Sequence, residues 1–208
     1  MSIKDAYNSW AVQYDSNDNK TRDLESIALR NTLGGMSFTN CLEIGCGTGK
    51  NTIWLIEKAK YLLAVDLSEE MLKRAREKVM SNKVEFRQVD IRQRWSFSDR
   101  HFDLVTFSLV LEHIADLDYV FKEAAEILHS DGYLYMGELH PFKQYAGTKA
   151  RFETGEGIQI VECYNHNVSD FIQAGKKHGL SVIDLNEYFD EDDRNSIPRI
   201  LTILFRKN

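Results

Sequence analysis

Apolar residues recur along the chain with two alternating periods. Short runs rich in leucine, isoleucine, valine and phenylalanine predict buried strands, whereas apolar residues spaced three and four apart predict amphipathic helices. The predicted strands lie at residues 41–44, 61–66, 84–89, 102–107 and 133–136, and the predicted helices between them lie at residues 50–58, 69–80 and 117–128. Short apolar strands that alternate with helices of about ten residues are typical of a parallel sheet that is covered on both faces.

The end of the chain has a different pattern. A predicted helix at 168–177 is followed by strands at 180–189 and 197–205, and the acidic run 190–193 separates these two strands. Strands joined by so short a polar turn are most easily antiparallel. We therefore predict an α/β fold of the doubly wound, Rossmann-like type. It has a seven-stranded, mostly parallel sheet with an antiparallel C-terminal hairpin, and helices on both faces.

Residues 1–36 predict an N-terminal helical segment ahead of the first strand. Tyr7, Trp10 and Tyr14 share one helical stripe, which is most simply interpreted as core packing, and a second helix ends at two glycines. Glycine accepts the left-handed conformation that is common at helix ends. With 208 residues the chain is long enough for one core without disulfides or a structural metal. We expect a single domain over residues 1–208.

Charge and cysteine content narrow the possible partners and ligands. The net charge of −6 opposes a nucleic-acid backbone, so no nucleic-acid partner is expected, and the basic run at 87–94 is interpreted as a strand end and loop. Cys41, Cys46 and Cys163 lack the paired spacing of metal ligands and are too few for a disulfide framework. We therefore expect no metal and a reducing, cytoplasmic location. No apolar run approaches eighteen residues, so no membrane partner is expected.

Gly45, Gly47 and Gly49 follow the first predicted strand. Glycines let the backbone turn sharply and let a ligand lie against bare main chain, while the next helix points its free N–H groups toward that ligand. The pattern predicts a cofactor site at the carboxyl end of the strand, where ligands bind in such sheets. A dinucleotide loop requires a third glycine where this chain has Lys50, which disfavours a nicotinamide cofactor.

The run LEIGCGTG at residues 42–49 resembles the first motif of class I S-adenosylmethionine-dependent methyltransferases. The segments that continue this resemblance, in the family's order, are residues 64–68, 88–91, 102–113 and 128–134. The opening segment, residues 7–15, is similar to that of small-molecule methyltransferases of the ubiquinone and menaquinone methyltransferase-like group, methyltransferase type 11. The resemblance implies S-adenosyl-L-methionine as the cofactor and methyl transfer to a small-molecule acceptor as the activity.

The resemblance also implies which residues hold the cofactor. The Asp66 carboxylate would accept hydrogen bonds from both ribose hydroxyls, and the Asp90 carboxylate would accept one from the adenine amine. The remaining implied contacts are Leu67, Met71 and Ile91 at the adenine, Glu43, Gly45 and Gly47 at the methionine portion with Cys46 beside them, Ser108 and Leu109 near the sulfonium, and Tyr14 closing over the cofactor.

Candidate bases follow the fourth and fifth predicted strands. A sulfonium methyl group is already activated, so the protein mainly supplies proximity, orientation and exclusion of water. If the acceptor is a hydroxyl or an acidic carbon, a nearby base could remove its proton. We predict His140, His113 and Glu138 as catalytic or substrate-contacting residues, with His140 first. The alternatives are a helix-start role for His113 and a turn fixed by Pro141 for His140.

The connection at residues 141–167 is unusually long, and long loops inside a compact domain are uncommon unless they are functional. We predict that it forms a lid over the substrate, with Arg151 recognising an anionic group. Two alternatives to methyl transfer stay open at this point. One is an oxidoreductase that binds a nicotinamide or flavin through the same topology, and the other is a module that binds S-adenosylmethionine without catalysis.

Overall fold

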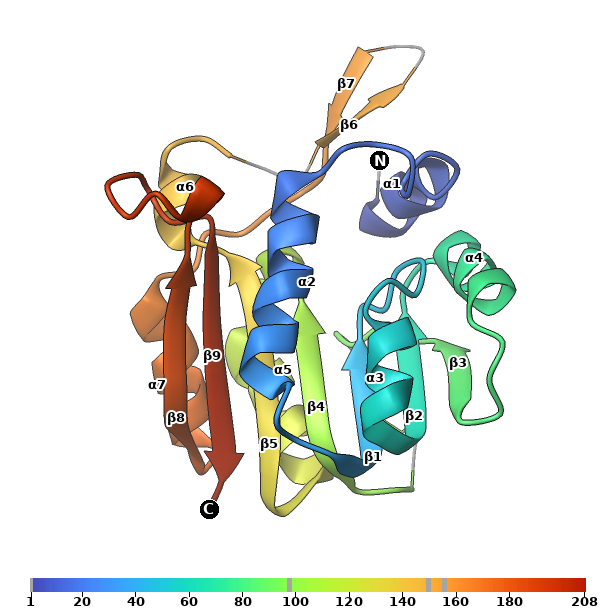
Figure 1. Ribbon diagram of the computed structural model, residues 1–208, viewed down its shortest axis with the longest axis vertical. Helices are drawn as coiled ribbons and strands as arrows, with labels where there is room; N and C mark the ends of the chain where they lie inside the picture. Colours follow the sequence, from blue (N-terminus) through green and yellow to red (C-terminus); the bar gives the residue numbers. More distant parts are fainter. Residues whose placement is uncertain (1, 97–98, 149–150, 155–156) are drawn as a thin grey trace.

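Seven strands form one sheet within the described ranges, 2–96, 99–148, 151–154 and 157–208, of the computed structural model (Figure 1). Their spatial order is β3-β2-β1-β4-β5-β9-β8. The strands are β1 (Phe38–Ile44), β2 (Ala59–Asp66), β3 (Val84–Gln88), β4 (Phe102–Ser108), β5 (Leu128–Leu139), β8 (Leu180–Tyr188) and β9 (Ile200–Lys207). The pairs from β3 through β5 are parallel, and β9 is antiparallel to β5 and β8. The predicted doubly wound, Rossmann-like sheet with its antiparallel C-terminal hairpin is thus confirmed.

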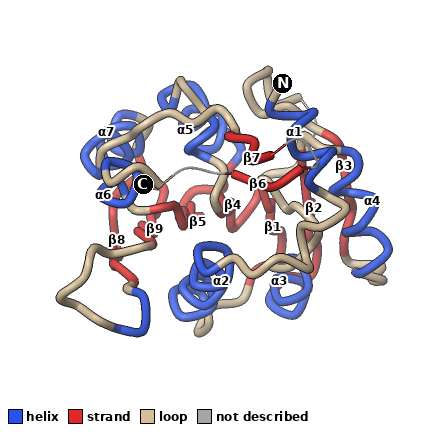
Figure 2. Tube along the Cα trace, turned by 90° about the horizontal axis from the view of Figure 1, so that it is seen from above, coloured by secondary structure: helices blue, strands red, loops and turns tan. Residues whose placement is uncertain are grey.

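Helices cover both faces of this sheet (Figure 2). α2 (Lys20–Leu33) and α3 (Thr52–Lys58) lie on one face, and α5 (Leu117–Ile127) and α7 (Val168–Lys177) lie on the other. α4 (Glu69–Lys78) packs beside β2 and β3. No helix in the described part of the chain combines the length and the apolar character needed to cross a bilayer.

Apolar cores on both faces hold these layers together. On the α5 and α7 face, the rings of Phe107, Phe121 and Phe205 are fully buried, and their centroids lie 6.4 and 5.8 Å apart. On the opposite face, Leu29 of α2 and Leu55 of α3 are equally buried. Each such side chain contributes about 1.5–3 kcal/mol to stability. The cores therefore give a firm support to the loops at the carboxyl edge of the sheet.

The first helix, α1, spans Ile3–Trp10. It is shorter than the helical spacing of Tyr7, Trp10 and Tyr14 predicted. Tyr14 lies in the turn that follows this helix, although it shares helical spacing with Tyr7 and Trp10. Ring contacts still join the three, with centroids 5.7 Å apart for Tyr7 and Trp10 and 4.9 Å apart for Trp10 and Tyr14. The guanidinium of Arg22 donates to the Tyr14 carbonyl, so this contact from α2 holds the chain in a turn where the apolar spacing predicted helix.

Strand boundaries near the carboxyl terminus also differ from those predicted. The last strand begins at Ile200 rather than at residue 197, because Pro198 lacks an N–H group and cannot donate within a sheet. The fifth strand extends well past the predicted range 133–136 to Leu139. Its neighbour β9 continues alongside it, with Ile200 paired to Leu139, and this pairing prolongs the strand.

The long connection at residues 141–167 contains regular structure rather than a plain loop. It has a short helix, α6 (Pro141–Tyr145), and an antiparallel hairpin of β6 (Arg151–Thr154) and β7 (Gly157–Ile160). The hairpin projects beyond the carboxyl edge of the sheet, near α1 (Figures 1 and 2). The side chain of Arg151, predicted to recognise an anion, lies outside the described residues.

Candidate active site

The glycine turn lies at the carboxyl end of β1 and is tied to β2. The N–H groups of Gly45 and Cys46 both donate to the Val65 carbonyl, at 2.8 and 3.0 Å. Gly45 has a φ of +71°, a left-handed conformation that favours glycine, and a Cβ atom there would lie 2.2 Å from Cγ2 of Val110. The turn therefore keeps the backbone of Gly45 bare, as a ligand-binding loop requires.

Asp66 ends β2, and its carboxylate fastens the glycine turn. Oδ2 accepts the N–H of Gly47 at 2.9 Å, and Oδ1 accepts the N–H of Ser68 at 2.8 Å. Burial raises the pKa of Asp66, although these N–H donors oppose the shift. Each carboxylate oxygen keeps a further lone pair, so the group can still accept two hydroxyls. This arrangement fits a vicinal diol such as that of ribose.

A pocket opens beside these groups at the carboxyl edge of the sheet. Most residues predicted to hold the cofactor line this pocket, namely Tyr14, Gly45, Gly47, Asp66, Leu67, Met71, Asp90, Ile91, Ser108 and Leu109. The loops after β1, β2, β3 and β4 thus meet around one cavity, as expected for a doubly wound sheet.

Glu43 and Cys46, which were also predicted at the cofactor, are not among the lining residues of this pocket. Cys46 is buried against Leu72 of α4. Glu43 is buried in β1 and accepts a 2.6 Å hydrogen bond from the Thr52 hydroxyl, and burial raises its pKa to about 8. The contact gives Glu43 the partner that a carboxyl group in an apolar strand needs. It also joins β1 to the beginning of α3, and the glycine turn connects these two elements.

Asp90 lies on the pocket wall in the loop after β3. Its carboxylate accepts hydrogen bonds from Nε and Nη2 of Arg92, both at 2.8 Å, and these bonds lower the pKa of Asp90. An ionised carboxylate only accepts, so it suits recognition of an amine donor such as that of adenine. Leu67 and Met71 add apolar surface nearby. The composition of this wall fits a flat, amine-bearing ring.

The loop after β4 contributes main chain to the same pocket. Leu109 has a φ of +56°, which is uncommon for a residue with a side chain, and its N–H donates to the Gly137 carbonyl at 2.9 Å. The N–H groups of Val110 and Leu111 donate to Oε1 of Glu138 at 3.0 and 2.9 Å. Burial raises the pKa of Glu138 to about 8. Strained backbone persists only where its surroundings hold it, and here β5 holds it through Glu138.

His113 ends the short 3-10 turn η1 (Leu111–His113), and it lines the pocket. Its Nδ1 lies 2.8 Å from the Glu162 carbonyl and its Nε2 lies 2.7 Å from the Tyr7 hydroxyl. Because a carbonyl only accepts, Nδ1 carries the proton in the neutral ring and Nε2 accepts from Tyr7. Burial raises the pKa of Tyr7 well above its ordinary value, so this hydroxyl stays protonated and remains a donor.

His140 has a different environment from the one predicted. It is fully buried at the end of β5, where it caps α6 and its Nδ1 accepts the Phe142 N–H at 3.2 Å. Its Nε2 donates to Oε1 of Glu187 at 2.9 Å. Both ring nitrogens are engaged, and His140 is not among the residues that line the pocket. This geometry favours the turn role fixed by Pro141, and it leaves His113 as the histidine at the pocket.

A second cavity adjoins the first. Tyr7, Tyr14 and Leu109 line both cavities, so the two cavities meet at these residues. Glu112 and Arg199 also line the second cavity, and neither was predicted at the site from the sequence. For Glu112 the available signal was a carboxyl group inside an apolar run, directly before a candidate base. No local pattern marked Arg199, which comes to the cavity from the beginning of the last strand.

Comparison with known proteins finds methyltransferases. A family model described as a methyltransferase domain matches residues 42–136. An uncharacterized methyltransferase of Emericella nidulans is 27% identical over 222 residues, which cover 88% of this chain and 77% of the relative. The ubiquinone biosynthesis O-methyltransferase of Nitrosomonas europaea is 26% identical over 110 residues, which cover 52% of this chain and only 47% of the relative.

A solved structure from Listeria monocytogenes, described as an S-adenosylmethionine-dependent methyltransferase, has the same fold. Its TM-score is 0.77 at 25% identity, and the match covers 89% of this chain and 99% of that one. The chain therefore contains a methyltransferase domain at residues 42–136, it has the fold of S-adenosylmethionine-dependent methyltransferases, and its cofactor is S-adenosylmethionine. These matches disfavour the dinucleotide-binding alternative. The match spans less than half of the ubiquinone biosynthesis relative, so it does not by itself transfer that relative's acceptor.

Proposed function

We propose that this chain transfers a methyl group from S-adenosylmethionine to a small-molecule acceptor bound in the second cavity, hereafter the acceptor cavity. The observation that carries the proposal is that Tyr7, Tyr14 and Leu109 line both cavities. Ligands in two cavities that meet at shared residues lie close to each other, and methyl transfer depends chiefly on proximity and orientation. The name of the ubiquinone biosynthesis relative supports an acceptor of low molecular mass.

The residues around the first pocket would hold the cofactor in the manner that the family resemblance implies. Asp66 would hold the ribose hydroxyls and Asp90 the adenine amine, while the bare backbone at Gly45 would receive the methionine portion. Leu109 would present main chain beside the sulfonium, and Tyr14 would cover the ligand. When bound, S-adenosylmethionine supplies an already activated methyl group. The carboxylates around the pocket favour a cationic ligand by Coulomb attraction.

Tyr7 and His113 would remove the acceptor proton. As the acceptor atom gains its bond to the methyl carbon, its proton would pass to the Tyr7 oxygen while the Tyr7 proton passes to Nε2 of His113, over the existing 2.7 Å contact. The Glu162 carbonyl would keep the ring oriented by accepting from Nδ1. A positioned acid–base group of this kind contributes about 10²–10⁴-fold to rate. In this proposal His140 and Glu138 support the loops and do not act as bases.

Residues 141–167 are proposed to cover the acceptor cavity. Thr148 lines that cavity. The N–H of Tyr164 donates to the Glu112 carbonyl at 2.7 Å, and this bond fixes the end of the segment against the loop after β4. The segment therefore has one anchored end beside the cavity, while its hairpin projects past the sheet edge (Figure 1). Such a cover would exclude water during transfer.

A turnover assay tests this proposal. The purified protein is incubated with S-adenosylmethionine and a panel of small hydroxyl, amine and acidic-carbon compounds, and S-adenosylhomocysteine is measured. With an accepted compound, Tyr7→Phe and His113→Gln should each lower kcat by about 10²–10⁴-fold, while calorimetry finds the cofactor affinity close to that of the parent protein. Tyr61→Phe is the matched control, because it removes a hydroxyl bonded to Glu85 at 2.8 Å, remote from both cavities.

Two results would contradict the proposal. Binding of NADH without binding of S-adenosylmethionine would refute the cofactor. Release of S-adenosylhomocysteine with protein or nucleic acid acceptors alone would refute the small-molecule acceptor. Cofactor binding without turnover on any class of acceptor would instead support the non-catalytic module.

A further inference from the structure

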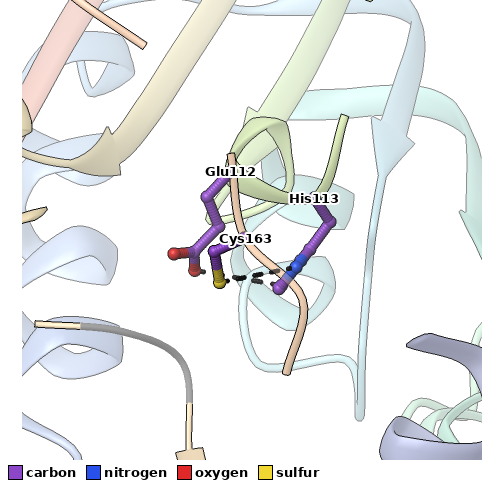
Figure 3. A group of neighbouring side chains, drawn as sticks. All are labelled: Glu112, His113 and Cys163. Carbon is purple, nitrogen blue, oxygen red and sulfur yellow. Dashed lines mark hydrogen bonds and ion pairs between the residues drawn. The ribbon is translucent and has the colours of Figure 1, made fainter. Parts of the chain in front are cut away.

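Glu112, His113 and Cys163 bring a carboxylate, an imidazole and a thiol together beside the proposed active site (Figure 3). One ligand atom of each residue lies within 4.8 Å of the other two. Nε2 of His113 is 3.9 Å from Oε1 of Glu112, and Sγ of Cys163 is 3.9 Å from Nδ1 of His113. The function proposed above uses His113 but leaves Glu112 and Cys163 without a role.

We propose that these three side chains form a binding site for a zinc ion. Sulfur, imidazole nitrogen and carboxylate oxygen are the donors that Zn²⁺ takes in proteins, and three protein ligands with one open position are a known coordination pattern. An ionised thiol and an ionised carboxyl group would together neutralise the charge of the ion. The donor set excludes Mg²⁺ and Ca²⁺, which prefer oxygen ligands.

One oxygen of the Glu112 carboxyl group is buried without a partner. Glu112 is only 7% exposed, and its Oε2 has no hydrogen-bond partner among the described residues. A buried carboxyl oxygen left unpaired costs free energy, so such atoms normally bind a hydrogen-bond donor or a metal. The other oxygen, Oε1, lies 3.9 Å from Nε2 of His113, so an ion at this cluster would satisfy Oε2 if the carboxyl group turned or bound the ion through both oxygens.

The orientation of His113 also suits metal binding. A histidine that ligates a metal through one nitrogen almost always donates its other ring N–H to a carbonyl or carboxylate. In this chain Nδ1 already donates to the Glu162 carbonyl at 2.8 Å. Nε2 therefore carries the lone pair for the ion, and Oε1 of Glu112 lies 3.9 Å from it. Sγ of Cys163 lies 3.9 Å from Nδ1 instead, so the thiol has to turn toward Nε2 to complete the site.

Main-chain contacts hold the cysteine in place before any ion binds. The N–H of Tyr164 donates to the Glu112 carbonyl at 2.7 Å, and the Glu162 carbonyl accepts from His113. These two bonds fix the residues on both sides of Cys163 against η1. Ligand atoms about 2.0–2.3 Å from zinc are about 3.3–3.8 Å apart. The donor atoms, which lie within 4.8 Å of one another, therefore have to move closer together to bind an ion.

The zinc site would compete with the Tyr7 hydroxyl, which lies 2.7 Å from Nε2 of His113. An ion on that nitrogen takes the lone pair that now accepts from Tyr7. If His113 acts in proton removal, which rests on the proposed function, zinc would inhibit methyl transfer reversibly. The site itself does not depend on that function, since its donors are present whatever the acceptor is.

Cobalt binding provides the test, because Co²⁺ occupies zinc sites and reports thiolate ligation by its absorption. Chelator-treated protein is titrated with Co²⁺ under reducing conditions. We expect one ion per chain, a sulfur-to-cobalt charge-transfer band, and complete displacement by Zn²⁺, which binds more tightly. Cys163→Ser should abolish the band, and Glu112→Gln should weaken binding at least tenfold. Cys41→Ala and His178→Gln are matched controls that should leave the spectrum unchanged.

Two outcomes would overturn the zinc site. One is the absence of the charge-transfer band in the parent protein, and the other is a band that persists in Cys163→Ser. Calorimetry with S-adenosylhomocysteine confirms that each variant is folded, so loss of the band is not mistaken for unfolding. Turnover of zinc-free protein tests the proposed function separately, and either proposal can fail while the other stands.

Discussion

The cofactor loop after β1 can form because residue 45 is glycine and has no Cβ atom. The backbone there has a φ of +71°, and the position of a Cβ atom is already occupied by Val110, whose Cγ2 would be 2.2 Å away. Val110 in turn is held by Glu138 through its main-chain N–H. A substitution at Gly45 thus disturbs two loops at once, the one after β1 and the one after β4.

Gly45→Ala should therefore weaken cofactor binding. A left-handed conformation costs a residue with a Cβ roughly 1–2 kcal/mol, and relief of the contact with Val110 requires further movement of the loop. We expect the affinity for S-adenosylmethionine, measured by calorimetry, to fall at least about tenfold, with a near-native far-ultraviolet circular dichroism spectrum. The matched control is Gly35→Ala, where an added Cβ meets no atom within 4 Å. Equal affinities for the two variants would contradict this account of the turn.

The N-terminal helix α1 is held by polar contacts in addition to the apolar cluster that Ala6 and Trp10 form with Met71 of α4. The Asn8 side chain accepts a 2.6 Å hydrogen bond from the Ser68 hydroxyl at the beginning of α4. Beyond the helix, Arg22 of α2 donates to the Tyr14 carbonyl and stacks over the Tyr14 ring at 5.0 Å. These contacts hold Tyr7 and Tyr14 where the two cavities meet.

Arg22→Met should release this element while keeping a long side chain. Loss of a charged hydrogen bond of this kind costs about 1.5–3 kcal/mol, so amide exchange in α1 should accelerate. The affinity for S-adenosylmethionine should fall roughly tenfold, because the segment that carries Tyr14 then has to become ordered when the cofactor binds. Arg30→Met, an exposed position on the same helix, is the control and should change neither measurement. Unchanged exchange in Arg22→Met would show that α1 is held by its apolar contacts alone.

At the scale of the whole molecule, buried carboxyl groups from three elements gather near the carboxyl edge of the sheet. Glu25 of α2 accepts hydrogen bonds from Asn51 at 2.9 Å and Tyr135 at 3.1 Å. Burial raises the pKa of Glu25 to about 7, and those of Glu43 and Glu138 to about 8, from an ordinary value of 4.5. Folding therefore favours the protonated form of each group, and this preference links stability to pH.

The cofactor-free protein should become less stable as the pH rises from about 4.5 to about 8. In this range the folded state retains protons on Glu25, Glu43 and Glu138 that the unfolded chain has released, so ionisation favours unfolding. Denaturant titrations should give a higher free energy of unfolding at pH 5.5 than at pH 8. Glu43→Gln should flatten this slope, whereas the exposed control Glu77→Gln should not. A free energy of unfolding that rises over the same pH interval would refute the raised pKa values of these three carboxyl groups.

Sequence alone determined the order and type of most elements, the glycine turn and the cofactor class. Each of these depends on residues close together in the chain. Periodicity requires a window of about ten residues, and the motifs at 42–49 and 64–68 span fewer. Glu43, a carboxyl group within an apolar strand, finds its partner in Thr52, only nine positions away. Apolar periodicity failed at Tyr14, because a side-chain bond from Arg22 to the Tyr14 carbonyl holds the chain in a turn and such a polar contact has no periodic signal.

Only the tertiary structure decided which side chains meet at the active site. His113 contacts Tyr7 across 106 positions and Glu162 across 49, whereas His140 is engaged by Glu187 across 47. Cys163 reaches the same histidine from 50 positions away, so spacing along the chain could not reveal a metal-binding cluster. Such contacts depend on how loops pack over the sheet edge, and packing between distant segments leaves no periodic signal in the sequence.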